Sequence, residues 1–266
     1  MQRYLGKKNF PFIKLSSRII SDYQGKLLAS GICDNTIGFY LHNIKALFRK
    51  GCREMGLELP CPFRDISIKT EKTLKRSLDP VVIKTLSASE LEKGSPLSLA
   101  RDIFMFSFYT RGMSFVDIAL LKKRHVFPGE ICYRRHKTDQ LMRVGINKEI
   151  SRILERYKNV PGEYIFPLFP AERDPYAGYR SAYHRIRYSL GKISRVIGLE
   201  FPLRLHAARH SWATIAKVNG ASVHVIGECL GHTSEKTTRI YLKELDHSAL
   251  DAVNNQVADF ILAVDD

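Results

Sequence analysis

Helical periodicity governs most of this chain and fails at one place. Apolar residues recur at three- and four-residue intervals, which predicts amphipathic helices over residues 15–31, 34–56, 97–109, 114–122, 146–158 and 179–197, and from 206 nearly to the end. In segment 130–146, polar and apolar residues instead alternate around Thr138, Asp139 and Gln140, which predicts a β-hairpin. The expected fold class is therefore mainly α with a small antiparallel β-sheet, an α+β fold.

Two domains are expected. Residues 66–80, ISIKTEKTLKRSLDP, are polar, rich in lysine and closed by a proline, which is typical of a linker. We place the boundary there, with a helical domain over 1–74 and a second domain over 75–266. One stripe of the second predicted helix is apolar and is expected to face the core of the first domain: Ile37, Leu41, Ile44, Leu47 and Phe48.

Charge narrows the choice of partner. The chain has 42 Lys and Arg against 27 Asp and Glu, a formal charge of +15. So large an excess favours a polyanion, most simply nucleic acid, over a merely solvated basic surface. A membrane surface is the alternative, but no basic amphipathic helix lies beside a lipidation signal. No apolar run approaches the ~20 residues of a membrane span and no signal peptide is evident, so we expect a cytoplasmic, nucleoid-associated protein.

Metal and disulfide chemistry are not expected. The five cysteines are scattered along the chain and never form a CxxC pair: Cys33, Cys52, Cys61, Cys132 and Cys229. This spacing favours free thiols over disulfides and disfavours zinc ligation. No cluster of Asp and Glu calls for a magnesium ion, so we expect neither a metal nor a cofactor.

Three local patterns carry the candidate chemistry. The first, RLHAARHSWATIAKVNGA, places His206 and Arg209 three residues apart on one helical face. The second, ECLGHTSEKTTRIYLK, places Tyr241 nine residues after His232, and the third is Lys137 in the predicted hairpin. Each alone has an ordinary structural reading: a core histidine, a packing tyrosine and a solvated lysine.

In this order and spacing, the patterns resemble the tyrosine recombinases, also called the phage integrase family, from about residue 97 to the C-terminus. The resemblance implies that Tyr241 is the nucleophile and forms a 3′-phosphotyrosine bond with DNA. It further implies that Arg209 binds the scissile phosphate, with His206 and His232 as hydrogen-bonding and proton-handling groups. Lys137 would protonate the leaving 5′-oxygen.

These residue types suit the reaction. A phosphodiester is anionic, so attack without a metal needs cationic donors and a hydroxyl nucleophile. Arginine stays charged and bonds two phosphate oxygens at once. A phenol with a pKa of ~10 is easier to deprotonate than serine and leaves readily in the reverse step.

The first arginine of the family pattern is displaced in this chain. The family places it in TGLRxSEL, and when SFVDIALL is aligned on that helix, Ser114 falls at the arginine position. Arg111 lies three residues earlier, and in a helical segment it would share a face with Ser114, one turn away. We predict that Arg111 supplies the guanidinium, aided by a tight backbone at Gly112, while Asp117 orients the helices. The alternative is that Arg111 caps the helix ending at Tyr109.

The resemblance also implies a clamp around double-stranded DNA that carries inverted core sites. The family's clamp domain has four main helices and only two are predicted here, so we expect the chain to begin inside that domain or to be unusually short. The residues expected to contact DNA are Lys45, Arg49, Lys50, Arg53, Lys72, Lys75, Arg76, Ser114 and Arg239.

Assembly on DNA is implied by the tail. Residues 246–264 hold an apolar helical stripe: Leu250, Val253, Val257, Phe260, Ile261 and Val264. It resembles the family's C-terminal helix that docks in a neighbouring subunit, which implies a homotetramer on DNA; folding back on its own core is the alternative. Accessory DNA-bending proteins are further candidate partners.

The implied function is site-specific recombination through a Holliday junction, for integration, excision or inversion of a DNA element. Two rivals stay open. A type IB topoisomerase uses the same chemistry only to relax supercoils. A non-catalytic, sequence-specific DNA-binding regulator is favoured by the displaced first arginine.

Overall fold

The structure is a computed structural model that describes residues 4, 6, 10–69, 71, 77–169, 175–232 and 234–242, without the side chains of 175–177, 240 and 241. Lys72, Lys75, Arg76 and the tail predicted to join subunits lie outside these residues. The chain divides into two compact units, residues 1–74 and residues 75–266. The clamping and subunit-joining roles assigned to these parts stay predictions.

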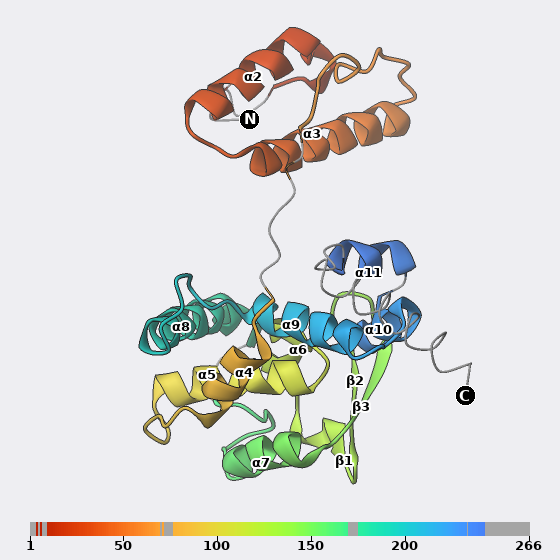
Figure 1. The fold of residues 1–266 in the computed structure, drawn as a ribbon. Coiled ribbons are helices and arrows are strands. Elements are labelled where there is room, and N and C mark those ends of the chain that lie inside the picture. The colour runs from red at the N-terminus through yellow and green to blue at the C-terminus, as the bar shows by residue number, and fades with distance from the viewer. Residues whose placement is uncertain are drawn as a thin grey trace, which may run out of the picture. The chain divides into compact units, whose positions relative to one another are not determined.

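The first unit is a pair of helices with a short turn before them (Figure 1). The elements are η1 (Phe12–Lys14), α2 (Ser17–Ala29) and α3 (Asp34–Glu54). Ser16 caps α2 by accepting a hydrogen bond from the Ile19 amide, as its residue type favours. Most of the predicted apolar stripe faces the core, but Leu47 is 69% exposed. It lies at the margin of the stripe, where the helix turns toward solvent.

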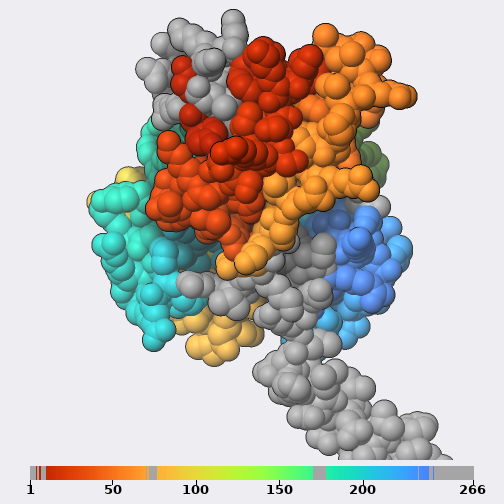
Figure 2. Space-filling model, turned by 90° about the horizontal axis from the view of Figure 1, so that it is seen from above, coloured from red at the N-terminus to blue at the C-terminus, as the bar shows by residue number. Residues whose placement is uncertain are grey.

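Residues 55–69 return alongside these two helices (Figure 2, orange against red). The Gln24 amide donates to the Ser67 carbonyl at 3.1 Å. Asn35 exchanges two hydrogen bonds of 2.9 Å with the Glu71 backbone, so the chain is fixed to the start of α3 just before it leaves the unit.

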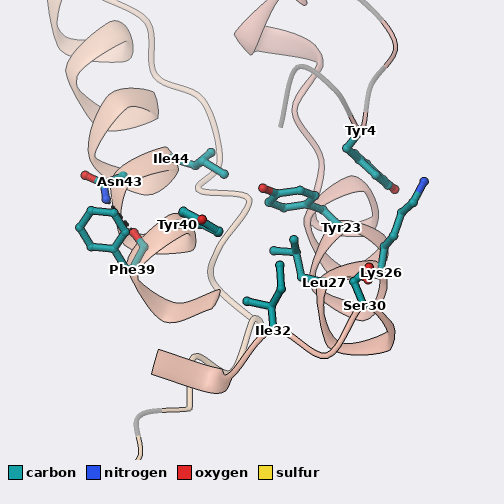
Figure 3. Close-up of a pocket in the computed structure, with 10 residues that line it drawn as sticks. All are labelled: Tyr4, Tyr23, Lys26, Leu27, Ser30, Ile32, Phe39, Tyr40, Asn43 and Ile44. Carbon is teal, nitrogen blue, oxygen red and sulfur yellow. Dashed lines mark hydrogen bonds between the residues drawn. The ribbon is translucent and has the colours of Figure 1, made fainter. Parts of the chain in front are cut away.

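An open groove of about 880 Å³ lies between α2 and α3 (Figure 3). Its walls are mostly aromatic and aliphatic. The Tyr4 and Tyr23 rings lie 5.2 Å apart, and the Lys26 ammonium lies over Tyr4.

The second unit is built around one buried helix, α5 (Pro96–Tyr109), which packs against α7, α8 and α9 (Figure 1). Ile103, Phe104 and Phe106 are fully buried, which explains why this helix is apolar on most sides. The other helices are α4 (Pro80–Ala88), α6 (Phe115–Ala119), η2 (Lys123–His125), α7 (Lys148–Tyr157), α8 (Pro175–Val196), α9 (Leu205–Val218), α10 (Val223–Leu230) and α11 (Glu235–Tyr241).

The predicted hairpin is confirmed as part of a three-stranded antiparallel sheet. Strands β1 (Val126–Phe127), β2 (Glu130–Arg134) and β3 (Leu141–Gly145) pair in the order β1-β2-β3. Ile131 opposite Val144 and Tyr133 opposite Met142 are buried, while alternate positions face outward.

Three helix predictions needed correction. Helix α4 is additional to the predicted helices, because the polar segment before Pro80 hides its start; Asp79 caps it by accepting from the Val81 amide at 2.7 Å. The helix expected over 114–122 ends at Ala119, since the Leu121 carbonyl accepts from Ile165 instead. The long C-terminal helix is divided at Gly220 and Gly231, both left-handed. Among the described residues, no helix is long and apolar enough to cross a membrane.

Candidate active site

Arg209 lies at the centre of the site and is 6% exposed. Helix α9 carries it, and its guanidinium joins two distant segments. Nη1 donates to the Gly112 carbonyl at 2.8 Å, in the turn between α5 and α6, and Nη2 donates to the Leu230 carbonyl at 2.5 Å, at the end of α10. The protein's own backbone therefore holds the cation in place, which the predicted phosphate-binding role requires.

Gly112 is required by this packing. Its φ is +75°, and a Cβ built there would lie 2.5 Å from Arg209 Cγ. Only glycine combines that backbone with so close an approach. The α5–α6 turn therefore rests directly on the Arg209 side chain.

Arg111 precedes this glycine and lies in the same turn between α5 and α6. The helical segment that would place Arg111 and Ser114 on one face does not form, because α5 ends at Tyr109 and Arg111 has a left-handed φ of 61°. Its Nη1 donates to the Arg143 carbonyl on β3 at 3.4 Å, so this bond ties the guanidinium to the sheet and not to the end of α5. A non-glycine residue in this conformation is uncommon, and strained residues of this kind cluster at functional sites.

Ser114 is an N-cap. Its hydroxyl accepts from the Asp117 amide at 3.4 Å and donates to Asp117 Oδ2 at 2.6 Å. Asp117, 5% exposed, also accepts from the His136 amide through Oδ1 at 2.8 Å. The carboxylate thus connects the start of α6 to the hairpin turn.

The hairpin turn supplies two cations. Lys137 is exposed within it. Arg135, which sequence reasoning missed, is half-buried and donates through Nη1 to the Gly231 carbonyl, the left-handed C-cap of α10. The only available signal was its place in the basic run RRHK, which does not tell a solvent-facing arginine from one that turns inward.

His232 follows that cap and is surrounded by positive charge. Its Nε2 lies 3.0 Å from Arg209 Nη2. Burial lowers its pKa to about 4, helped by the charges of Arg209, Arg135 and Lys137. The imidazole is therefore neutral at pH 7. His206, one helical turn before Arg209, is exposed and packs its ring edge-on against His210 at 4.6 Å between centroids.

Helix α11 ends with Tyr241, whose side chain lies outside the described part. Its neighbour Leu242 is buried with Ala213, Ile226 and Leu230. Lys217 of α9 donates to the Leu242 carbonyl at 3.1 Å. The end of the candidate nucleophile's helix is therefore held against the same two helices that carry Arg209 and precede His232.

The predicted DNA contacts that the structure describes are solvent-accessible. Arg49, Lys50 and Arg53 are exposed on α3, and Lys45 is half-buried. Arg239 on α11 is exposed and pairs with Glu235 at 3.4 Å. Both partners of this pair are exposed, so Arg239 is able to exchange Glu235 for a phosphate.

Comparison with known proteins decides the family. The model of the phage integrase family matches residues 78–247. The chain belongs to this family, the tyrosine recombinases. Tyrosine recombinase XerD of Pseudomonas putida is 24% identical over 230 residues, covering 84% of this chain and 76% of that protein. Tyrosine recombinase XerC of Bradyrhizobium diazoefficiens is 28% identical over 183 residues, covering 65% of this chain and 56% of that protein, so the recombinase spans only about half the length of some curated relatives.

Solved structures share the fold. The integrase of transposon Tn1549, in complex with circular intermediate DNA, superimposes with a TM-score of 0.68 at 14% identity, covering 94% of this chain and 89% of that one. A lambda integrase dimer bound to a core site gives a TM-score of 0.67 at 16% identity, covering 92% and 87%. The mainly α fold with a small antiparallel sheet is thereby confirmed.

Proposed function

We propose that this tyrosine recombinase cuts and rejoins double-stranded DNA at specific sites through a 3′-phosphotyrosine intermediate. The observation that carries the proposal is the position of Arg209. It is buried between the turn that contains Arg111 and the turn at Gly231 that precedes His232. Helix α11, with Tyr241, is anchored beside them. The DNA complexes of the Tn1549 and lambda integrases support DNA as the partner.

The proposed reaction replaces one ester bond at phosphorus with another. The Tyr241 oxygen attacks the scissile phosphate, forming a P–O bond to tyrosine as the bond to the 5′-oxygen breaks. The proton from the phenol passes to His206, one of the two histidines expected to handle protons, and Lys137 gives its own proton to the departing 5′-oxygen. Arg209 and Arg111 neutralise charge that builds on the phosphate oxygens. Attack by another strand's 5′-hydroxyl reverses these steps and rejoins the DNA.

A suicide substrate tests the reaction class. A duplex nicked close to the cleavage point loses its short 5′ fragment after attack, so an active enzyme is trapped as a covalent adduct that survives denaturing electrophoresis. We expect such an adduct with relaxed linear DNA. A non-catalytic regulator would bind the duplex without any adduct. A topoisomerase-like enzyme would form one yet yield no Holliday junction from two sites.

Lys137 is proposed as the general acid. We expect Lys137→Ala to cleave an ordinary phosphodiester about 10²–10⁴-fold more slowly than the parent protein, which is the usual effect of losing a general acid. A substrate with sulfur at the 5′-bridging position should restore the rate, because a thiolate leaves without a proton.

The matched control for Lys137 is Lys123→Ala. Lys123 donates to the Val160 carbonyl at 2.5 Å, which occupies its ammonium group within the fold. The Lys123→Ala variant should therefore cleave the ordinary and the sulfur-containing substrate at the parent rate. If sulfur rescues Lys123→Ala but not Lys137→Ala, the acid has been assigned to the wrong lysine.

We further propose that the first unit clamps DNA through the basic residues of α3, and that four protomers assemble on two duplexes through the tail. Recombination exchanges two pairs of strands, which is the physical reason for four active sites. A head-to-tail contact made by each tail would close such a ring. Analytical sedimentation with and without DNA that carries paired sites measures the oligomeric state. We expect a monomer in free solution and a tetramer only on DNA.

A further inference from the structure

The contact between Arg209 and His232 determines where the imidazole proton lies. A guanidinium has five N–H donors and no acceptor. The 3.0 Å contact between Arg209 Nη2 and His232 Nε2 is therefore a hydrogen bond only if Nε2 presents its lone pair. Because the ring is neutral at pH 7, its proton must be on Nδ1.

The Nδ1 proton points to helix α11. His232 Nδ1 lies 2.9 Å from Thr238 Oγ1, and since Nδ1 carries the proton, the imidazole donates and the threonine accepts. Thr238 is fully buried. Its hydroxyl also meets α10 so closely that a Cβ at Gly227 would lie 2.8 Å from Oγ1. The threonine therefore occupies a fixed position and is shielded from water.

Thr238 is one helical turn before Tyr241 on α11. A continuous chain of hydrogen bonds thus runs from the guanidinium of Arg209, through both nitrogens of His232, to the helix that carries the candidate nucleophile. Within the described residues, Lys217 makes a separate link from α9 to this helix through the Leu242 carbonyl. Among the contacts that the structure describes, this lysine restrains the C-terminal end of α11 and does not involve the imidazole.

We propose that Thr238 is a positioning residue for DNA cleavage: it holds the His232 proton on Nδ1 and thereby couples the Arg209–His232 pair to the Tyr241 helix. The proposal rests on the proposed recombinase function. With the proton held on Nδ1, Nε2 faces the Arg209 side of the site as an acceptor. A ring free to rotate would lose that arrangement, and α11 would lose its polar link to the phosphate-binding residue.

The charged groups around His232 are consistent with this role. Arg209 and Arg135 approach from α9 and the hairpin, and Lys137 adds a third positive charge from the hairpin turn. All three oppose a second proton on the ring. The ring keeps one proton, on Nδ1, and the hydroxyl of Thr238 accepts a hydrogen bond from it.

The first measurement uses the free protein without DNA. In ¹⁵N-labelled protein at pH 7, the His232 side-chain nitrogens should show protonated Nδ1 and unprotonated Nε2, with an Nδ1 proton that exchanges slowly. Thr238→Ser keeps the acceptor and should keep this signature. Thr238→Val has nearly the same shape but no acceptor, so its Nδ1 proton should exchange fast or disappear from the spectrum. A protonated Nε2 in the parent protein would overturn the assignment outright.

The second measurement is the rate of covalent trapping on the nicked duplex. We expect Thr238→Val to be slower by about tenfold, the effect of losing one buried hydrogen bond, and Thr238→Ser to stay within about threefold of the parent. The exposed neighbour gives the matched control, and Thr237→Val should trap at the parent rate. If the valine and serine variants slow equally, or the valine variant does not slow, Thr238 does not position His232 for cleavage.

These two measurements separate the possible failures. If the parent protein traps no DNA, the proposed function fails, but the spectra still report the proton on His232. If Thr238→Val does not fold, as judged by circular dichroism, Thr238→Ala, which also lacks the acceptor, replaces it in both measurements.

Discussion

Tyr241→Phe is expected to bind duplex DNA with the affinity of the parent protein and to form no covalent protein–DNA adduct. The change removes only the phenolic oxygen, which makes the bond to phosphorus in the proposed reaction. The basic residues that contact the backbone are left intact, so the electrostatic part of binding should persist. Gel shift measures binding, and denaturing electrophoresis after trapping on the nicked duplex measures the adduct.

Other tyrosines serve as controls for this result. Tyr188 is 67% exposed on α8 and Tyr188→Phe should trap DNA normally. Tyr179 packs against Phe115 with ring centroids 5.4 Å apart, and burial raises its pKa, which makes it a poorer nucleophile. Burial also raises the pKa of Tyr133, with help from the nearby Asp117 carboxylate. An adduct that survives in Tyr241→Phe would move the assignment to Tyr188 or Tyr179.

Arg111→Ala is expected to lower the cleavage rate by roughly 10²-fold or more, because loss of one transition-state donor costs about 3 kcal/mol. DNA affinity should change little, since many cations share the binding energy. Single-turnover trapping at saturating protein separates the two quantities.

The left-handed backbone at Arg111 offers a control for folding. Alanine keeps the strain at a φ of 61°, whereas glycine accepts this conformation freely. Arg111→Gly should therefore be at least as easy to accommodate as Arg111→Ala and equally slow in cleavage. If the glycine variant cleaves normally, the guanidinium is not needed.

Ser114→Ala completes the comparison. It removes the N-cap of α6 and the bond to Asp117, so we expect a loss of about 1 kcal/mol in stability. Its cleavage rate should fall far less than that of Arg111→Ala. The opposite ranking would show that Ser114, and not Arg111, occupies the role of the first arginine.

The sequence by itself determined the fold class and the family. Helical periodicity with one alternating segment is a local property, and the side chains that create it are the ones later found in the core, such as Ile103 on α5 and Ile131 on β2. The spacing of His206, Arg209, His232 and Tyr241 is also local, because each pair lies within or between neighbouring helices. The family could therefore be inferred from order and spacing alone.

Tertiary structure alone decided how the groups meet. Arg111 could not be placed from sequence, because its delivery depends on a left-handed turn that packs on a side chain 98 positions later in the chain, Arg209. The inward position of Arg135 could not be predicted either, since its guanidinium donates to a carbonyl at the end of α10, which only the tertiary fold brings to the hairpin. The sequence alone indicates no more for Thr238 than a place in a helix; its role depends on the contact between α10 and α11. Periodicity and spacing record which face of a helix is buried, whereas these contacts depend on how separate elements pack, and that information is spread over the whole core.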